Sequence, residues 1–209
     1  MTRENDLLFA KYDLREVLEN QTRTMFGDID ALDGGRLLSR SADVWADELT
    51  AKYSIAPLAL DETGITVDQQ EADVNVSNDF GRAIFDRSRS FHIKGVCISF
   101  FVPFTGDEEL FFCQPSSYTL NPPYGRVDGK ALVVTFTRTD HDPAAVKAEF
   151  ERQLGSIKGY LETIVRDLEA FNAGLRSAAK IRLERRMEKV RKDQALVADL
   201  GYPQRPRRQ

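Results

Sequence analysis

The chain has 209 residues, of which 42% are hydrophobic, so it is long enough to bury a core without disulfides or a metal. Its formal net charge is −4 and its isoelectric point is about 5.4. These values exclude the broad basic field that is typical of proteins that coat nucleic acid.

The charge is distributed unevenly along the chain. Residues 176–209 hold 11 basic and 4 acidic side chains, a net charge of +7, which leaves −4 − 7 = −11 for residues 1–175. We therefore expect an acidic α+β domain over residues 1–175 and a basic helical extension with a linker-like tail over residues 176–209. Such asymmetry is typical of an end that docks or tethers a molecule.

The first part of the chain predicts two helices. From Asn5 to about Ile29, apolar residues recur at spacings of three, four and seven with charges between them, which is typical of an amphipathic helix. Gly34-Gly35 ends this region. Ser41 is a suitable N-cap for a second, shorter helix, which Pro57 stops.

Two further features bear on the compartment. No basic segment followed by an apolar run stands at the N-terminus, and no apolar run approaches the roughly 20 residues that cross a bilayer. Cys97 and Cys113 have apolar neighbours, which favours buried, reduced thiols over a disulfide. We expect a cytoplasmic protein that does not contact a membrane.

The middle of the chain changes to the period of β-strands. Residues 65–67 and 74–76 alternate apolar and polar, and residues 91–104 become apolar on both faces, as in a central strand. Asp128-Gly129 predicts a tight hairpin before the apolar stretch 131–137. Because the connections are too short for helical crossovers, we predict a mostly antiparallel sheet of four to six strands.

The helical period returns after Asp142, a predicted N-cap. A heptad-like stripe then runs through Val146, Phe150, Leu154, Ile157, Leu161, Ile164, Leu168, Phe171 and Leu175. It breaks at Arg182 and resumes on a shifted face from Leu183, and a kink is allowed near Gly174. The fold class is therefore predicted as α+β, with N-terminal helices and long C-terminal helices flanking the sheet.

The stripe can be covered in two ways. Phe150, Ile157, Ile164 and Phe171 lie seven residues apart, and we predict that they form the seam of a homodimer. Alternatively, the sheet and the N-terminal helix cover the stripe within one chain.

No residue pattern predicts a catalytic, cofactor or metal site. His92 and His141 are too few for a histidine-rich metal site, and neither has a second ligand at a recognised spacing. The string 140–142, Asp-His-Asp, has acid/base residue types, but it lies at a strand-to-helix turn where Asp142 caps the helix. The phosphate-binding glycine loops and the nucleophile elbow are absent from the sequence, so we expect a protein that is not an enzyme and needs no cofactor.

The candidate contact surface is the basic part of the last helix. Its six basic residues are Arg182, Arg185, Arg186, Lys189, Arg191 and Lys192. They can bind the phosphates of a nucleic acid or the acidic face of a partner, although solvated basic helix faces are common. A second candidate is the loop 114–125, whose aromatic residues can hold a peptide or a stacked base; its Pro and Asn residues also suffice to explain a packed turn.

Some strings resemble a known group of sequences. They are Pro103–Phe111, Thr137–Asp142, and Arg191–Gln194 together with Leu200–Pro203. They resemble the N-terminal region of predicted bacterial restriction-endonuclease-like defence proteins, where a region of this size precedes a linker and a C-terminal nuclease domain. The chain stops at Gln209, where that linker would begin, so no nuclease residue is expected in it.

The resemblance implies a non-catalytic regulatory, sensing or assembly module. Its partner would be a C-terminal effector domain or a second copy of the chain. The alternative hypothesis is a nucleic-acid-binding module that uses the basic C-terminal helix. The two hypotheses differ in their response to salt, because phosphate binding weakens steeply with salt and apolar helix pairing does not.

Overall fold

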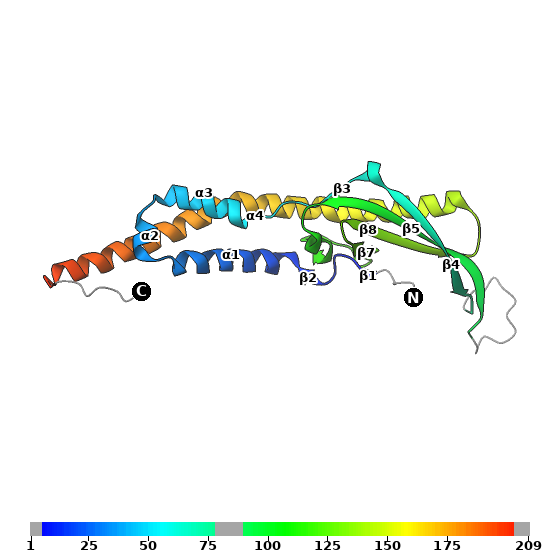
Figure 1. Cartoon of the computed structure of the whole chain (residues 1–209), viewed down its shortest axis with the longest axis horizontal. Coiled ribbons are helices and arrows are strands. Elements are labelled where there is room, and N and C mark those ends of the chain that lie inside the picture. The colour runs from blue at the N-terminus through cyan, green and yellow to red at the C-terminus, as the bar shows by residue number, and fades with distance from the viewer. Residues whose placement is uncertain (1–5, 78–89, 203–209) are drawn as a thin grey trace. The chain divides into compact units, whose positions relative to one another are not determined.

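The computed structural model describes residues 6–77 and 90–202 (Figure 1). The chain forms two compact units, here called the sheet unit (Met1–Leu14 with Ala56–Arg166) and the helical unit (Arg15–Ile55 with Asp167–Gln209). Helix α4, Pro143–Asp199, supplies its first part to the sheet unit and the remainder to the helical unit. The charge distribution predicted a domain boundary after residue 175, and this position falls inside the helical unit.

The sheet unit contains a six-stranded antiparallel sheet in the order β1-β7-β8-β5-β3, with β4 also paired to β5. Its strands are β1 (Asp6–Leu7), β3 (Ala59–Leu60), β4 (Thr66–Asn75), β5 (His92–Thr105), β7 (Tyr124–Asp128) and β8 (Ala131–Arg138). The remaining elements of this unit are the parallel pair β2 (Tyr12–Asp13) and β6 (Cys113–Gln114), and the 3-10 turns η1 (Glu62–Gly64) and η2 (Glu108–Phe112). The α+β fold with an antiparallel sheet, predicted from the sequence, is confirmed.

Strand β5 is the centre of this sheet. It pairs with β4 along one edge and with β8 along the other, which explains why its sequence is apolar on both faces. The predicted hairpin at Asp128-Gly129 joins β7 to β8, and Gly129 adopts a φ of 59°, which favours glycine.

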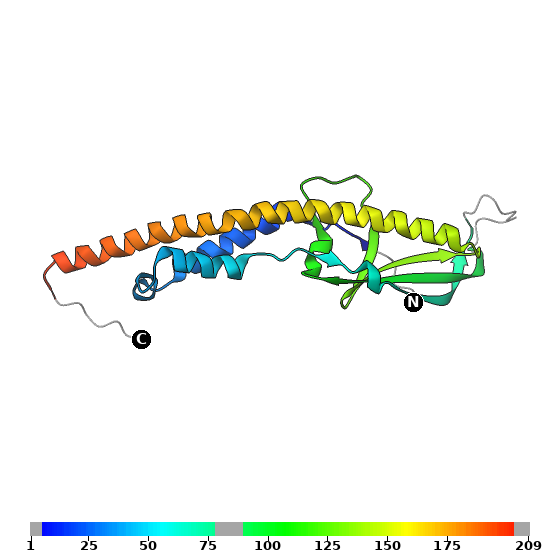
Figure 2. The same cartoon turned by 90° about the horizontal axis from the view of Figure 1, so that it is seen from above.

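The first part of α4 runs along the sheet (Figures 1 and 2). Phe150 stacks on Phe100 of β5 with ring centroids 4.0 Å apart. Of the residues proposed for a dimer seam, Phe150, Ile157 and Ile164 are 6%, 0% and 1% exposed, and Phe171 is partly buried against the core of the helical unit. This is the arrangement in which one chain covers its own stripe, so the four side chains do not form an open seam.

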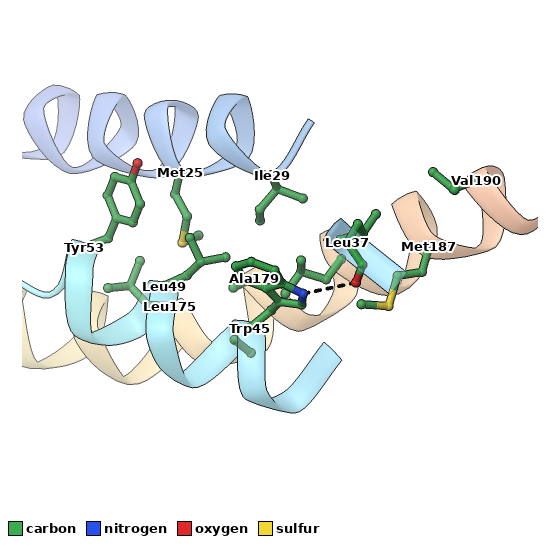
Figure 3. Packing of buried hydrophobic residues seen from close by; sticks show 12 residues of the cluster. Met25, Ile29, Leu37, Trp45, Leu49, Tyr53, Leu175, Ala179, Met187 and Val190 are labelled. Carbon is green, nitrogen blue, oxygen red and sulfur yellow. Dashed lines mark hydrogen bonds between the residues drawn. The ribbon is translucent and has the colours of Figure 1, made fainter. Parts of the chain in front are cut away.

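The helical unit packs three helices on the second part of α4. They are α1 (Leu14–Ala31), α2 (Gly34–Leu38) and α3 (Ala42–Tyr53). The shared core is drawn in Figure 3 and includes Met25, Ile29, Leu37, Trp45, Ala46, Leu49, Tyr53, Leu175, Ala179, Leu183, Met187 and Val190. The indole Nε1 of Trp45 donates to the carbonyl of Leu37 over 3.1 Å, so the buried ring has its polar group satisfied.

The helix boundaries partly differ from the prediction. The first helix begins at Leu14 instead of Asn5, because residues 6–7 and 12–13 pair as strands. Gly34-Gly35 starts α2 instead of ending a region, because the Asp33 carboxylate accepts from the N–H groups of Gly35 and Arg36 and so caps a new helix. Ser41 caps α3 as predicted.

Helix α4 continues through Gly174 as one helix. Leu175 and Ala179, which follow Gly174 on α4, are buried in the helical core, so packing outweighs the weak helix propensity of Gly174. None of the helices in the described part of the chain is both long enough and apolar enough to span a bilayer.

Candidate functional site

A cleft of about 800 Å³ lies in the sheet unit between the sheet and the start of α4. Its apolar floor is formed by Val96, Ile98 and Phe100 of β5 and by Val146 of α4. Its rim is polar and carries both signs of charge: Gln69, Glu71, Lys94, Arg138, Asp140, His141, Asp142 and Lys147. Clefts of this size with an apolar base are typical ligand sites.

The strand register explains why these side chains meet. Val96 lies opposite Glu71 of β4 and opposite Arg138 of β8, and residues directly opposite each other share a face of the sheet. Side chains alternate along a strand, so Phe100 lies on the same face as Val96, and it stacks on Phe150 of α4. The cleft is therefore on the face that α4 partly covers.

Arg138 is held by two carboxylates at the rim. Its Nε and Nη2 donate to Asp140 over 3.1 and 2.8 Å, and its Nη1 donates to Glu149 over 3.0 Å. The hydrogen bonds with Asp140 raise the pKa of Arg138 and hold the pKa of Asp140 below its ordinary value. Asp140 is thus a fixed anion that orients the guanidinium of Arg138. A carboxylate held in this way is unsuited to proton transfer near neutral pH.

The Asp-His-Asp string ends at the N-terminus of α4. The Asp142 carboxylate accepts from the N–H groups of Ala144 and Ala145 over 3.0 and 3.1 Å, so it caps the helix as predicted. His141 between the two aspartates is exposed at the rim. The string therefore has a structural role in shaping the end of the cleft.

Two rim charges are less engaged than Arg138. Glu71 is exposed and forms no hydrogen bond or ion pair with the other described residues, and Lys147 lies 3.8 Å from the Glu151 carboxylate, with its own side chain 77% exposed. Lys94 is bound to Asp73 over 2.8 Å. The cleft thus offers a negative group on β4 and a positive group on α4 beside one apolar floor.

Of the six candidate contact residues, Arg182 pairs with another helix of the helical unit, as do Arg176 and Lys180 just before it. Three cations reach aspartates of α1 and α3: Arg176 pairs with Asp43 and Asp47, Lys180 with Asp43, and Arg182 with Asp30. Arg182 stands where the apolar stripe breaks, and its pairing across to α1 accounts for a charge at that position.

Further along α4, two of the candidate contact residues pair within their own helix. Lys189 lies 3.2 Å from Asp193, and Lys192 lies 2.6 Å from Glu188. Exposed pairs one turn apart contribute little stability, but they lower the positive charge that a phosphate would meet.

Arg185 and Arg191 are exposed and pair with no other residue that the structure describes. The Nε of Arg186 is buried without a hydrogen-bond partner in the same part of the chain. Residues 182–193 contain six basic and three acidic side chains, a net charge of +3. A low net charge of this kind favours a solvated helix face over a strong phosphate site. The basic residues after Tyr202 lie outside the described residues.

The two cysteines are free and buried. Burial raises the pKa of the Cys113 thiol to about 11, so it is protonated near neutral pH and not activated as a nucleophile. Over the described ranges, no three side chains of His, Cys, Asp or Glu gather as a metal ion would require.

The aromatic loop 114–125 is tied to α4. The N–H of Thr119 donates to the Tyr160 hydroxyl over 3.0 Å, that hydroxyl lies 3.0 Å from the Thr119 carbonyl, and Gln153 donates to the carbonyl of Tyr124. Tyr118 and Leu120 remain exposed. These contacts favour the packed-turn interpretation of the loop.

Sequence reasoning missed the cleft because its parts come from three segments of the chain, residues 69–71, 94–100 and 138–147. The sequence indicated a central strand that is apolar on both faces, but it did not indicate which face forms the cleft. That follows from the pairing of β5 with β4 and from the packing of α4. The assignment of this site rests on its geometry, since comparisons with family models, curated proteins and solved structures found no match to the chain.

Proposed function

We propose that the chain is a non-catalytic binding module that takes a segment of a partner protein in the cleft of the sheet unit. The observation that carries this proposal is the apolar floor between two loosely engaged charges of opposite sign, Glu71 on β4 and Lys147 on α4. A polypeptide supplies apolar groups and charges of both signs at such spacing, whereas an inorganic phosphate supplies no apolar group and a fatty acid supplies charge of one sign only.

The chemistry of the rim supports binding over catalysis. Arg138 and Asp140 hold each other, and Asp142 caps a helix. Groups that are fixed in ion pairs orient a ligand and add specificity, whereas general acid or base catalysis needs a group that gains and loses a proton near the working pH.

The biological role follows as part of the same proposal. The resemblance to the N-terminal region of restriction-endonuclease-like defence proteins suggests a module that senses a partner and regulates or assembles an effector in the cytoplasm. The low net charge of the basic helix and its ion pairs support this role over nucleic-acid binding.

The proposal is tested with a phage-displayed library of random peptides panned on the immobilised chain. A selected peptide is then titrated with the wild type and with two tryptophan variants by fluorescence anisotropy. Val96→Trp fills the cleft from its floor, whereas Thr137→Trp places the same ring at an exposed strand position opposite Cys97, on the other face of the sheet.

We expect Val96→Trp to weaken binding by about tenfold or more and Thr137→Trp to leave it unchanged. Lys147→Glu alters an exposed side chain and should weaken binding of peptides that carry a carboxylate. It tests the site independently, even if the tryptophan variant misfolds. Failure to select any peptide, or equal binding by all the variants, would refute a peptide site in the cleft.

A further inference from the structure

Strand β4 has one edge without a strand partner in the described part of the chain. All ten of its residues pair with β5, and neither β3 nor any other described strand pairs with its outer edge. In such an edge, the N–H and C=O groups of alternate residues point outward and can pair with another extended chain. Ten residues is long for an exposed edge strand, and Thr66–Asn75 contains no proline to interrupt added pairing.

The charge of β4 is of one sign. It carries Asp68, Glu71 and Asp73 and no basic residue. Lys94 neutralises Asp73 over 2.8 Å. Among the residues that the structure describes, Asp68 accepts only from its own strand, from the N–H of Gln69 and the side chain of Gln70. The edge therefore stays negative toward an incoming strand.

The side chains of β4 alternate between the cleft and the other face. Gln69 and Glu71 line the cleft, whereas Asp68 and Gln70 lie on the opposite face of the sheet. A strand that pairs with the outer edge would continue this alternation. Every second side chain of that strand would then lie on the cleft side, beside Gln69 and Glu71.

We infer that β4 takes a basic, extended segment of a partner protein as an added strand, with alternate side chains directed to the cleft side. Backbone pairing supplies the affinity in this mode, and the side chains supply the specificity. The segment that fits carries lysine or arginine on the face of Asp68 and an apolar residue at a cleft-facing position, and Glu71 adds to the negative charge that attracts it. This inference rests on the proposed function, because the cleft is expected to contact the partner's side chains.

The same charges disfavour the other occupants of an open edge. A second copy that pairs through its own β4 sets two strands of three carboxylates and no cations against each other, and like charges across strands are destabilising. The phosphates of a nucleic acid are repelled for the same reason.

The test uses fluorescein-labelled peptides of about ten residues, the length of β4. One peptide alternates lysine and valine, a second alternates glutamate and valine, and a third is the basic peptide with N-methyl groups on alternate backbone nitrogens. N-methylation removes the backbone donors and keeps the charge, so it separates strand pairing from simple attraction. Binding is followed by anisotropy, and protection of residues 66–75 is followed by hydrogen exchange with mass spectrometry.

We expect the basic peptide to bind and to slow exchange in residues 66–75, and the acidic and N-methylated peptides to bind about tenfold more weakly or worse. Asp68→Lys combined with Glu71→Lys should weaken the basic peptide by about tenfold, whereas Glu169→Lys, an exposed change in the helical unit, should have no effect.

Three results would overturn strand addition. They are equal binding of the N-methylated peptide, no change in exchange over residues 66–75, and protection there that rises with chain concentration without peptide, which would assign the edge to a second copy. If the library-selected peptide is sensitive to Val96→Trp but not to N-methylation, strand addition fails and the cleft proposal stands. If Val96→Trp has no effect on either peptide, the cleft proposal itself fails.

Discussion

Asn172 joins two segments of the helical unit that lie 117 residues apart in sequence. Its side-chain carbonyl accepts from the N–H of Ile55 over 3.1 Å, and its amide donates to the carbonyl of Ile55 over 3.0 Å. The chain has just left α3 at this point, so the two bonds satisfy backbone groups that no helix or strand satisfies.

Asn172→Ala should therefore lower the free energy of unfolding by about 1–3 kcal/mol, because both backbone groups of Ile55 lose their partner. Urea unfolding followed by the fluorescence of Trp45 measures this, since Trp45 is the single tryptophan and lies in the helical core. Glu169→Ala, an exposed substitution on the same helix, is the control and should change the value by less than about 0.5 kcal/mol. Equal values for the two variants would mean that the clamp is dispensable.

The ion pairs between α3 and α4 make the helical unit sensitive to acid. Hydrogen bonds from Lys180, and next from Arg176, hold the pKa of Asp43 below its ordinary value of 3.8. A carboxylate with a lowered folded-state pKa stabilises the fold above its unfolded pKa, and this contribution is lost as the pH falls through the folded pKa. The loss therefore belongs to pH values below about 4.

Asp43→Asn should remove part of this acid sensitivity. The thermal midpoint reported by Trp45 should be lower than that of the wild type near neutral pH, and the difference should shrink as the pH falls below about 4. Midpoints measured along a pH series for both proteins check this. A difference that stays constant through the acid range would contradict the role of the charged Asp43.

At the scale of the elements, two glycines have opposite surroundings. A Cβ on Gly155 of α4 would have no atom within 4 Å, whereas a Cβ on Gly95 of β5 would lie 2.5 Å from the carbonyl oxygen of Arg138 and 2.5 Å from a methyl of Val74. The first glycine only weakens a helix, and the second allows three strands to approach closely.

Gly155→Ala should raise the free energy of unfolding by about 1 kcal/mol, because alanine favours the helix. Gly95→Ala should lower it by about 1–3 kcal/mol, because the neighbouring backbone cannot yield without disturbing the β5–β8 pairing. Urea unfolding followed by circular dichroism measures both. If both substitutions changed the free energy of unfolding in the same direction, the packing around β5 would be looser than the distances around Gly95 indicate.

The long elements were predictable because their periodicity and end signals agree. Asp142 caps α4 and the turn at Asp128-Gly129 forms the hairpin, as their residue types predict. The short elements were not predictable from local pattern. Strands β1 and β2 exist only through their partners β7 and β6, and the apolar spacing there is equally compatible with a helix.

The candidate site shows the same limit. Asp140, His141 and Asp142 were noticed from their residue types, but their positions at the rim of a cleft depend on the pairing of β8 with β5. The six basic residues of α4 were also visible in the sequence. The partner of Arg182, Asp30, lies 152 residues away, and no local rule could have assigned it.

At the scale of the whole molecule, the apolar stripe of α4 serves the interior of one chain. Ile164 is 1% exposed, so Ile164→Glu would bury a carboxylate without a counterion. We expect the wild type to have the solution mass of one chain, 23.7 kDa, and Ile164→Glu to lose more than about 3 kcal/mol of stability. Sedimentation and urea unfolding measure these. A wild-type dimer that Ile164→Glu converts to a folded monomer would instead assign the stripe to a dimer seam.

If the sheet unit binds a peptide on the floor of its cleft, methyl NMR will detect the contact at the residues that form this floor. On addition of a library-selected peptide, the methyl signals of Val96, Ile98 and Val146 should shift, while those of Ile29 and Leu183 in the helical core should stay in place. Shifts confined to the helical unit, with the floor of the cleft unchanged, would contradict the account.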